Sequence, residues 1–77
     1  MKELINKLKD FLGNRVEDVR EKGPAELEIV MGEMEDVDVL SEEVKTHIVE
    51  LADENTVGKV DFVTSEGKEI YSFSLNQ

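Results

Sequence analysis

The chain has 77 residues, and 19 Asp and Glu against 9 Lys and Arg give it a formal charge of −10. This length fits one domain with a thin core, because apolar residues make up only 39% of the chain and charged residues 36%. So acidic a protein repels phosphate groups, which excludes nucleic acid and anionic membranes as partners and favours basic proteins and metal cations. The lack of cysteine excludes disulfides, thiolate zinc sites and thiol nucleophiles.

The sequence also carries no sign of a membrane or secretory segment. No apolar run approaches the roughly 20 residues that a membrane-spanning helix needs, and the N-terminus lacks the apolar stretch of a signal peptide. We therefore expect a soluble, cytoplasmic protein. Its richness in Lys and Glu, together with the absence of cysteine, follows the compositional trend of hyperthermophile proteins.

The N-terminal part of the chain is predicted to be helical. Apolar residues recur at helical spacing over 2–12, which predicts an amphipathic helix there. Val16 and Val19 continue this spacing beyond Gly13, so we expect a second helix over 15–22, either kinked from the first or continuous with it.

Farther along, apolar residues begin to alternate with acidic ones, and this period of two is typical of half-buried strands. The alternation predicts one strand over 26–31 and a second, shorter strand over 35–39. The two would form a hairpin whose loop is 32–34.

The predicted hairpin has a direct electrostatic consequence. Its buried side would pair Ile29 with Val37 and Leu27 with Val39, so its outer side would place Glu28 opposite Asp38. Like charges in this position are destabilising, and two carboxylates about 4 Å apart repel by about 1 kcal/mol in water. Some neighbouring positive charge is therefore expected to compensate them.

The rest of the chain is predicted to be a helix and a second hairpin. Ser41 matches an N-cap for a helix that ends near 53–55. The strands 57–64 and 68–75 would follow, with a turn through Glu66 and Gly67 that gathers the aromatic residues on one face. The predicted pairs are Phe62 with Tyr71, Val60 with Phe73, Gly58 with Leu75, and Val63 with Ile70.

These elements predict a single α+β domain over 1–77 in the order α(α)ββαββ. Its sheet would be mixed or antiparallel, with the helices packed on one face. The side of the sheet that meets the helices is expected to carry Leu27, Ile29, Val60, Phe62, Tyr71 and Phe73.

The negative charge is concentrated in one segment. Residues 25–43 contain eight carboxylates and no Lys or Arg, so this stretch carries −8 of the total charge of −10. Three interpretations stay open: a face that is solvated or neutralised by the basic residues of 1–24, a divalent-cation site, or a surface for a basic protein.

The leading functional hypothesis is a non-enzymatic domain that binds calcium or another hard divalent cation. Carboxylate oxygens are the ligands that such cations prefer, and calcium takes 6 to 8 of them. The alternative is a protein–protein interaction module that presents the same acidic patch to a basic partner. The candidate metal ligands are Glu28, Asp36 and Asp38, with Glu26, Glu33 and Glu35 assisting.

Other motifs are weaker. The segment 53–61 resembles an EF-hand calcium loop, but position 5 of the loop is Val57, and Thr64 stands at position 12, where a bidentate Glu is required. His47 is the only imidazole, which does not support a nitrogen-ligated metal site and predicts a residue at the core boundary. The chain has neither a nucleophile elbow nor a glycine-rich phosphate loop, so we expect no enzyme.

The 26–29 strand (Glu-Leu-Glu-Ile), the acidic cluster over 33–38 and the cysteine-free, Lys/Glu-rich composition together resemble one group of proteins. These are small acidic α+β proteins of unknown function from thermophilic methanogenic archaea. For that group an acidic pocket and calcium binding have been suggested. The resemblance implies an archaeal cytoplasm and calcium as the ligand.

Overall fold

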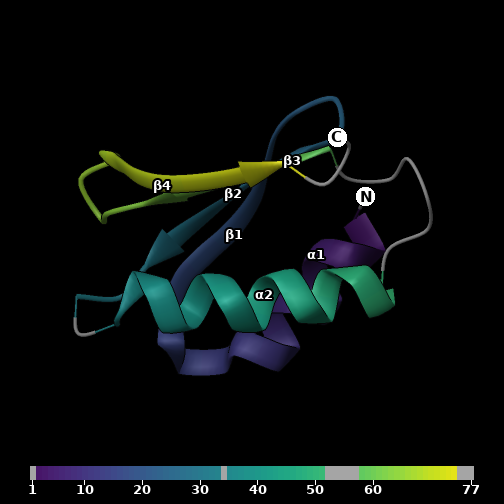
Figure 1. Ribbon diagram of the computed structural model, residues 1–77, viewed down its shortest axis with the longest axis horizontal. Helices are drawn as coiled ribbons and strands as arrows, with labels where there is room; N and C mark the ends of the chain where they lie inside the picture. The colour runs from purple at the N-terminus through teal and green to yellow at the C-terminus, as the bar shows by residue number, and fades with distance from the viewer. Residues whose placement is uncertain (1, 34, 52–57, 75–77) are drawn as a thin grey trace.

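Figure 1 shows the computed structural model, which describes residues 2–33, 35–51 and 58–74. Helices and strands follow one another along these residues in the manner of an α+β domain, which confirms the predicted class. In chain order they are α1 (Lys2–Leu12), a single 3-10 turn η1 (Gly13–Arg15), β1 (Val16–Gly23), β2 (Glu26–Met31), α2 (Val37–Leu51), β3 (Lys59–Val63) and β4 (Glu69–Ser74).

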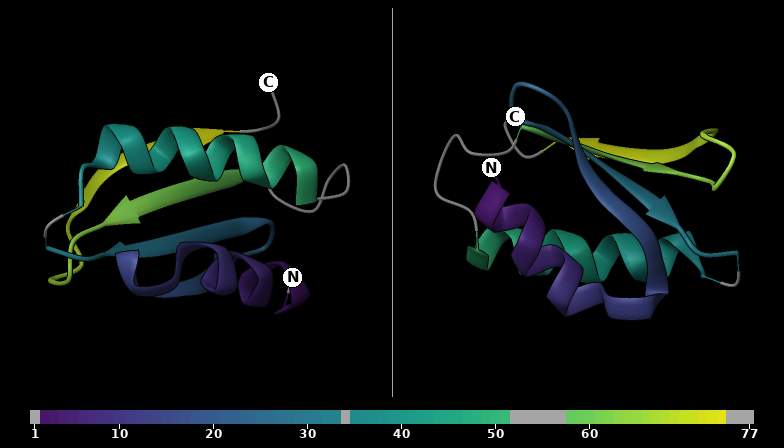
Figure 2. Two further views of the ribbon diagram at one scale, coloured as in Figure 1. Left: turned by 90° about the horizontal axis from the view of Figure 1, so that it is seen from below. Right: turned by 180° about the vertical axis from the view of Figure 1, so that it is seen from behind.

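The strands form one mixed sheet in the order β1-β2-β3-β4. β1 pairs antiparallel with β2, and β3 pairs antiparallel with β4. β2 and β3 run parallel, because α2 carries the chain back between them. Both helices lie on the same face of the sheet (Figure 2), α1 beside β1 and β2, and α2 beside β3 and β4. We call the other face, which no described helix covers, the open face.

The core lies between the helices and the sheet. Each helix buries a single apolar side, and within the described residues none is long and apolar enough to cross a lipid bilayer. The sheet contributes the side chains that face the helices, as predicted, although Tyr71 is 38% exposed. The buried cluster consists of Leu4, Leu8 and Leu12 from α1, Leu40, Val44 and Ile48 from α2, and Val19, Leu27, Ile29, Met31, Val60, Phe62 and Phe73 from the strands.

The predicted helix over 15–22 is wrong, because this segment forms β1. α1 ends at Leu12, because the next residue, Gly13, has a positive φ of 56° and turns the chain out of the helix. The pairing of β1 with β2 shifts register between Val16 and Asp18, as in a β-bulge. This extra residue turns both Val16 and Val19 toward the core, so an irregular strand displays the three-residue spacing of a helix.

The predicted strand over 35–39 is also wrong, because α2 begins at Val37. Asp36 caps the helix: its Oδ1 accepts hydrogen bonds from the backbone N–H of Asp38 at 2.9 Å and of Val39 at 3.5 Å. Val37 packs against the core whereas Val39 is 56% exposed, so their alternation in the sequence does not reflect a strand. Ser41 lies inside the helix, and its Oγ donates to the backbone oxygen of Asp38.

Without this strand, the predicted opposition of Glu28 and Asp38 does not exist. Glu28 lies between Arg20 of β1 and Asp61 of β3, its neighbours in the sheet. The predicted partners of Ile29 and Leu27 are wrong for the same reason: Ile29 pairs with Val19 and Phe62, and Leu27 with Glu21 and Val60.

The C-terminal hairpin confirms the predicted register at its centre. Phe62 pairs with Tyr71 and Val60 with Phe73, and the ring centroids of Phe62 and Phe73 lie 5.9 Å apart. Near the turn the register shifts, so Val63 pairs with Glu69 instead of Ile70. The predicted pair of Gly58 with Leu75, the end of α2 at 53–55 and most of the calcium-loop resemblance fall on positions outside the described residues.

Asp61 of β3 is fully buried although it lies on the open face. Lys22 of β1 reaches across β2, and its Nζ donates a hydrogen bond of 2.9 Å to Oδ2 of Asp61. The Nζ of Lys59 lies 3.6 Å from Oδ1, which accepts no hydrogen bond within the described part of the chain. The ion pair therefore ties the first strand of the sheet to the third.

The environment of Asp61 changes its titration. Burial raises the pKa of the carboxyl, but the hydrogen bond from Lys22 and the charges of Lys22 and Lys59 outweigh burial and leave the pKa below its ordinary value. Folding therefore favours the charged carboxylate. The resulting stability is present above the unfolded pKa of about 4 and is lost as the pH falls through the folded pKa.

We predict that Asp61→Asn lowers the free energy of unfolding at pH 7 by roughly 1 to 3 kcal/mol, because it removes a charge-assisted hydrogen bond from a buried position. The difference from the unmodified protein should shrink as the pH is lowered below 4. Urea unfolding at pH 7 and near pH 3 measures both values. Asp10→Asn, the same change at an exposed position of α1, should have little effect at either pH. A loss at Asp61 that stays constant with pH would contradict the assignment to its charge.

Candidate functional site

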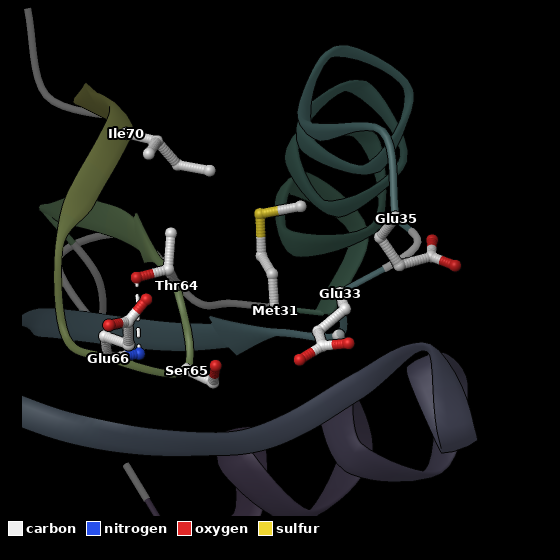
Figure 3. A pocket seen from close by; sticks show the side chains of 8 residues that line it. Met31, Glu33, Glu35, Thr64, Ser65, Glu66 and Ile70 are labelled. Carbon is white, nitrogen blue, oxygen red and sulfur yellow. Dashed lines mark hydrogen bonds between the residues drawn. The ribbon is translucent and has the colours of Figure 1, made fainter.

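The candidate site is a pocket at the end of the sheet where β2 and β3 finish. Parallel strands bring their carboxyl ends to the same edge, and in open α/β sheets ligands bind outside this edge. Here the loop after β2 and the turn after β3 enclose a pocket of about 260 Å³ (Figure 3). It is lined by Met31, Gly32, Glu33, Glu35, Thr64, Ser65, Glu66 and Ile70.

Gly32 fixes the first side of the pocket. Its backbone N–H donates a hydrogen bond of 3.4 Å to the carbonyl oxygen of Arg15, and its own carbonyl oxygen accepts one of 3.3 Å from Glu35. A Cβ atom at Gly32 would lie 3.2 Å from the Arg15 oxygen, so a side chain would press against the backbone of η1. This close approach holds the loop that carries Glu33 against the rest of the fold.

Thr64 organises the second side, which is the turn between β3 and β4. Its backbone N–H donates to Lys68 and its carbonyl oxygen accepts from Gly67, both at 2.9 Å. Its Oγ1 also accepts hydrogen bonds from the backbone N–H of Glu66 and of Lys68. Gly67 has a φ of 88°, a conformation that a side chain would strain. The turn therefore presents Ser65 and Glu66 at its tip (Figure 3).

The lining combines apolar surface with oxygen atoms. Met31 is buried at the end of β2 and Ile70 is 44% exposed at the start of β4. The polar side chains are the carboxylates of Glu33, Glu35 and Glu66 and the hydroxyls of Thr64 and Ser65, and no Lys, Arg or His is among the lining residues in the described part of the chain. The charged side chains of the lining are therefore all acidic.

Arg15 engages one of these carboxylates. Its Nε donates a hydrogen bond of 3.2 Å to Oε1 of Glu35, and the side chain of Glu35 turns away from the other lining residues (Figure 3). The other end of the guanidinium binds both carboxylate oxygens of Glu43 on α2. This fork lowers the pKa of Glu43, chiefly through its hydrogen bonds, and raises the pKa of Arg15.

Glu33 and Glu66 remain as the carboxylates with freedom to bind a ligand. Both side chains are exposed, and neither takes part in the hydrogen bonds and ion pairs found across residues 2–33, 35–51 and 58–74. They come from opposite sides of the pocket, one from the loop after β2 and one from the turn after β3.

The structure distributes the six predicted metal ligands over three places. Glu33 and Glu35 line the pocket. Glu26 and Glu28 lie on the open face, where Glu28 accepts a hydrogen bond of 2.7 Å from Arg20. Asp36 and Asp38 lie at the start of α2, where Asp36 is the cap. Among the described residues, no three His, Cys, Asp or Glu side chains come close enough to hold a metal ion as they stand.

Basic residues of the first third of the chain neutralise part of the acidic segment. Arg15 pairs with Glu35 and Glu43, and Arg20 pairs with Glu28. The internally neutralised interpretation therefore accounts for these three acids. Glu33, Asp36, Asp38 and Glu42 stay exposed, so an acidic surface extends from the pocket along the first turns of α2.

Glu66 is the lining carboxylate that sequence reasoning missed. The predicted hairpin turn through Glu66 is confirmed, but nothing local in the sequence connects that turn with the loop after β2. The available signal was the parallel pairing of β2 with β3, which brings both connections to one edge.

His47 is half-buried and stacks on Phe11, with 3.8 Å between the ring centroids. This position fits the predicted place at the core boundary, and His47 is not among the residues that line the pocket.

Comparisons of the chain with protein-family models, with curated proteins and with solved structures found no match.

We predict that Arg15→Gln raises the pKa of Glu43 toward its ordinary value, because the substitution removes the hydrogen bonds that hold this carboxyl in its charged form. Carbon-detected NMR titration of the glutamate side chains measures the shift. The melting temperature should fall at pH 7 but not near pH 3, since the stabilisation is lost as the pH falls through the lowered pKa. Arg20→Gln, which removes the partner of Glu28, should leave Glu43 unchanged; an equal shift in both variants would contradict the pairing.

Proposed function

We propose that this protein is a non-enzymatic cation-binding domain, and that its pocket takes a hard divalent cation, calcium in the first place. The observation that carries the proposal is the composition of the pocket: its polar side chains are carboxylates and hydroxyls, the ligands that calcium prefers. A cation there would be held by Glu33 and Glu66, with Ser65 and backbone oxygens of the two loops in reach.

Binding would have to draw the two carboxylates together. No described group of three acidic side chains is assembled in the absence of the ion, so Glu33 and Glu66 must change rotamer to share it. Both are exposed and lie in connections between elements, where side-chain rotation meets little steric resistance. A site that must assemble from few charged ligands should be weak, with a dissociation constant of about 10⁻³ to 10⁻⁴ M.

The exposed acids near the pocket support the same function. Asp36, Asp38 and Glu42 add negative potential beside the pocket, which raises the local concentration of cations. Of the ligands predicted from sequence, Glu33 would bind the ion directly, together with Glu66. Asp36 and Asp38 would only attract the cation to the pocket through their charge. Glu26 and Glu28, on the open face, are not required.

The second candidate function is binding of a basic protein at the same place. Its specific support is the apolar part of the lining, Met31 and Ile70, which would suit the aliphatic stem of a lysine or arginine whose charged end meets Glu33 and Glu66. The volume of about 260 Å³ lies just below the roughly 300 to 1,000 Å³ of pockets that hold drug-sized ligands, which is enough room for the end of one long side chain. Such binding would weaken strongly with salt.

Titration with calcium chloride, followed by amide resonances of the labelled protein, tests the first function. We expect local shifts at Gly32, Glu33 and 64–67 at or below millimolar calcium, and smaller shifts with magnesium, which loses its water less readily. The double variant Glu33→Gln with Glu66→Gln should lower the affinity at least about tenfold. Several millimolar calcium without local shifts would rule out the pocket as a calcium site.

The matched control is Glu3→Gln with Glu21→Gln, which makes the same change in net charge at exposed positions of α1 and β1 outside the pocket lining. This control should keep nearly full affinity. If it lost as much affinity as the pocket variant, the ion would be held by the overall charge instead of by a site. Shifts centred on Glu26 and Glu28 would instead favour the ligands predicted from sequence alone.

A further inference from the structure

The two edges of the sheet differ in how they are protected. β1 and β4 are the edge strands, and each pairs on one side only among the described residues. β1 carries charged side chains through most of its length, and its pairing is broken by two register shifts. Charges and bulges of this kind prevent an edge from pairing with another strand.

β4 lacks these devices. Its six residues, Glu-Ile-Tyr-Ser-Phe-Ser, contain one charge, at the first position, and no proline. The single register shift lies near the turn, so Tyr71, Ser72 and Phe73 keep regular pairing with β3. Ile70 and Tyr71 are 44% and 38% exposed. Figure 1 shows β4 as the outermost strand on its side of the sheet. A regular edge with exposed apolar side chains is a template for another strand.

The acidic pocket adjoins one end of this edge. Ile70 belongs to both β4 and the pocket lining, and Glu66 and Glu69 flank the same end. At the other end Lys45 of α2 lies over the ring of Phe73, 5.5 Å from its centroid. The edge is therefore acidic at its start and carries a positive charge beside its end, which gives a paired strand a preferred place for its own cation.

We propose that β4 binds an extended segment of a basic partner protein, which adds a fifth strand to the sheet and places a lysine or arginine at the pocket end of β4. Main-chain hydrogen bonds to β4 supply the affinity, and the cation at Glu66 fixes the register. The segment needs about six residues to follow β4, with apolar side chains beside Tyr71 and Phe73 on the helix-facing side.

The electrostatics favour this occupant over a second copy of the chain. Two copies would each bring a charge of −10 to the contact, and both pockets would stay without a cation. A basic segment instead lowers the total charge and fills the acidic end. The proposal does not depend on calcium, although a bound calcium ion would compete with the lysine of the segment at Glu66.

The test uses the peptide acetyl-Lys-Thr-Val-Thr-Val-Thr-Lys-amide, which has a lysine at both ends so that either strand direction can reach the pocket. Chelator in the buffer keeps the result independent of the calcium proposal. Labelled protein is titrated and its amide resonances followed. We expect shifts along β4 and at 64–67, slower hydrogen exchange of β4 amides, and unchanged resonances in β1 (Figure 1).

Two N-methylated forms of the peptide test strand pairing directly. The N–H groups of a strand point alternately to its two edges, so methylation of every second residue blocks one edge and leaves the other intact. One alternate set should weaken binding at least about tenfold, and the other should leave it nearly unchanged. Equal effects of both sets would overturn strand addition.

A peptide with norleucine in place of both lysines tests the cation, and it should bind at least about tenfold more weakly. Equal binding would overturn the assignment to a basic partner. If analytical ultracentrifugation showed concentration-dependent dimers that do not bind the peptide, the edge would be assigned to a second copy of the chain instead. Since calcium titration is a separate measurement, failure of the peptide to bind leaves the pocket proposal standing, and the reverse holds as well.

Discussion

A sheet with helices on one face only must make its second face compatible with water, and this constraint governs the distribution of charge in the protein. On the open face Lys22, Lys59 and Asp61 form one group of opposite charges, and Arg20 with Glu28 forms another. Val30 and Val63 pair on this face and are almost fully buried under their neighbours. Of the two acids of β2, Glu28 is thereby neutralised by β1, so it has a structural explanation that requires no ligand.

The remaining acids gather where the fold leaves them without basic partners. The crossover from β2 through α2 to β3 brings two connections that are distant in the sequence to the same edge of the sheet. Both connections carry glutamates. Arg15 reaches only the acids nearest to η1, Glu35 and Glu43. Glu33 and Glu66 stay exposed on opposite sides of the pocket, and the first turns of α2 extend the acidic surface beyond it.

Local periodicity predicted α1, β2 and the centre of the C-terminal hairpin, because in these elements one face is buried and the pattern is regular. It failed where the structure breaks the pattern. A bulge gives β1 the spacing of a helix, and the cap at Asp36 begins α2 within an apparent alternation. The side of the pocket that Glu66 forms could not be predicted from local patterns. It lies near the loop after β2 only because two strands that are distant in the sequence pair in parallel.

The pocket also spans the joint between the two parts of the fold. β1 with β2 and β3 with β4 are hairpins that form from neighbouring residues, whereas the parallel pairing of β2 with β3 requires closure of the long segment that contains α2. This pairing therefore closes the longest loop in the sheet and marks the line along which the two hairpins meet. Met31 and Glu33 lie on one side of that line, and Thr64 and Glu66 lie on the other. A ligand that binds both sides therefore holds the two hairpins together and stabilises the folded state.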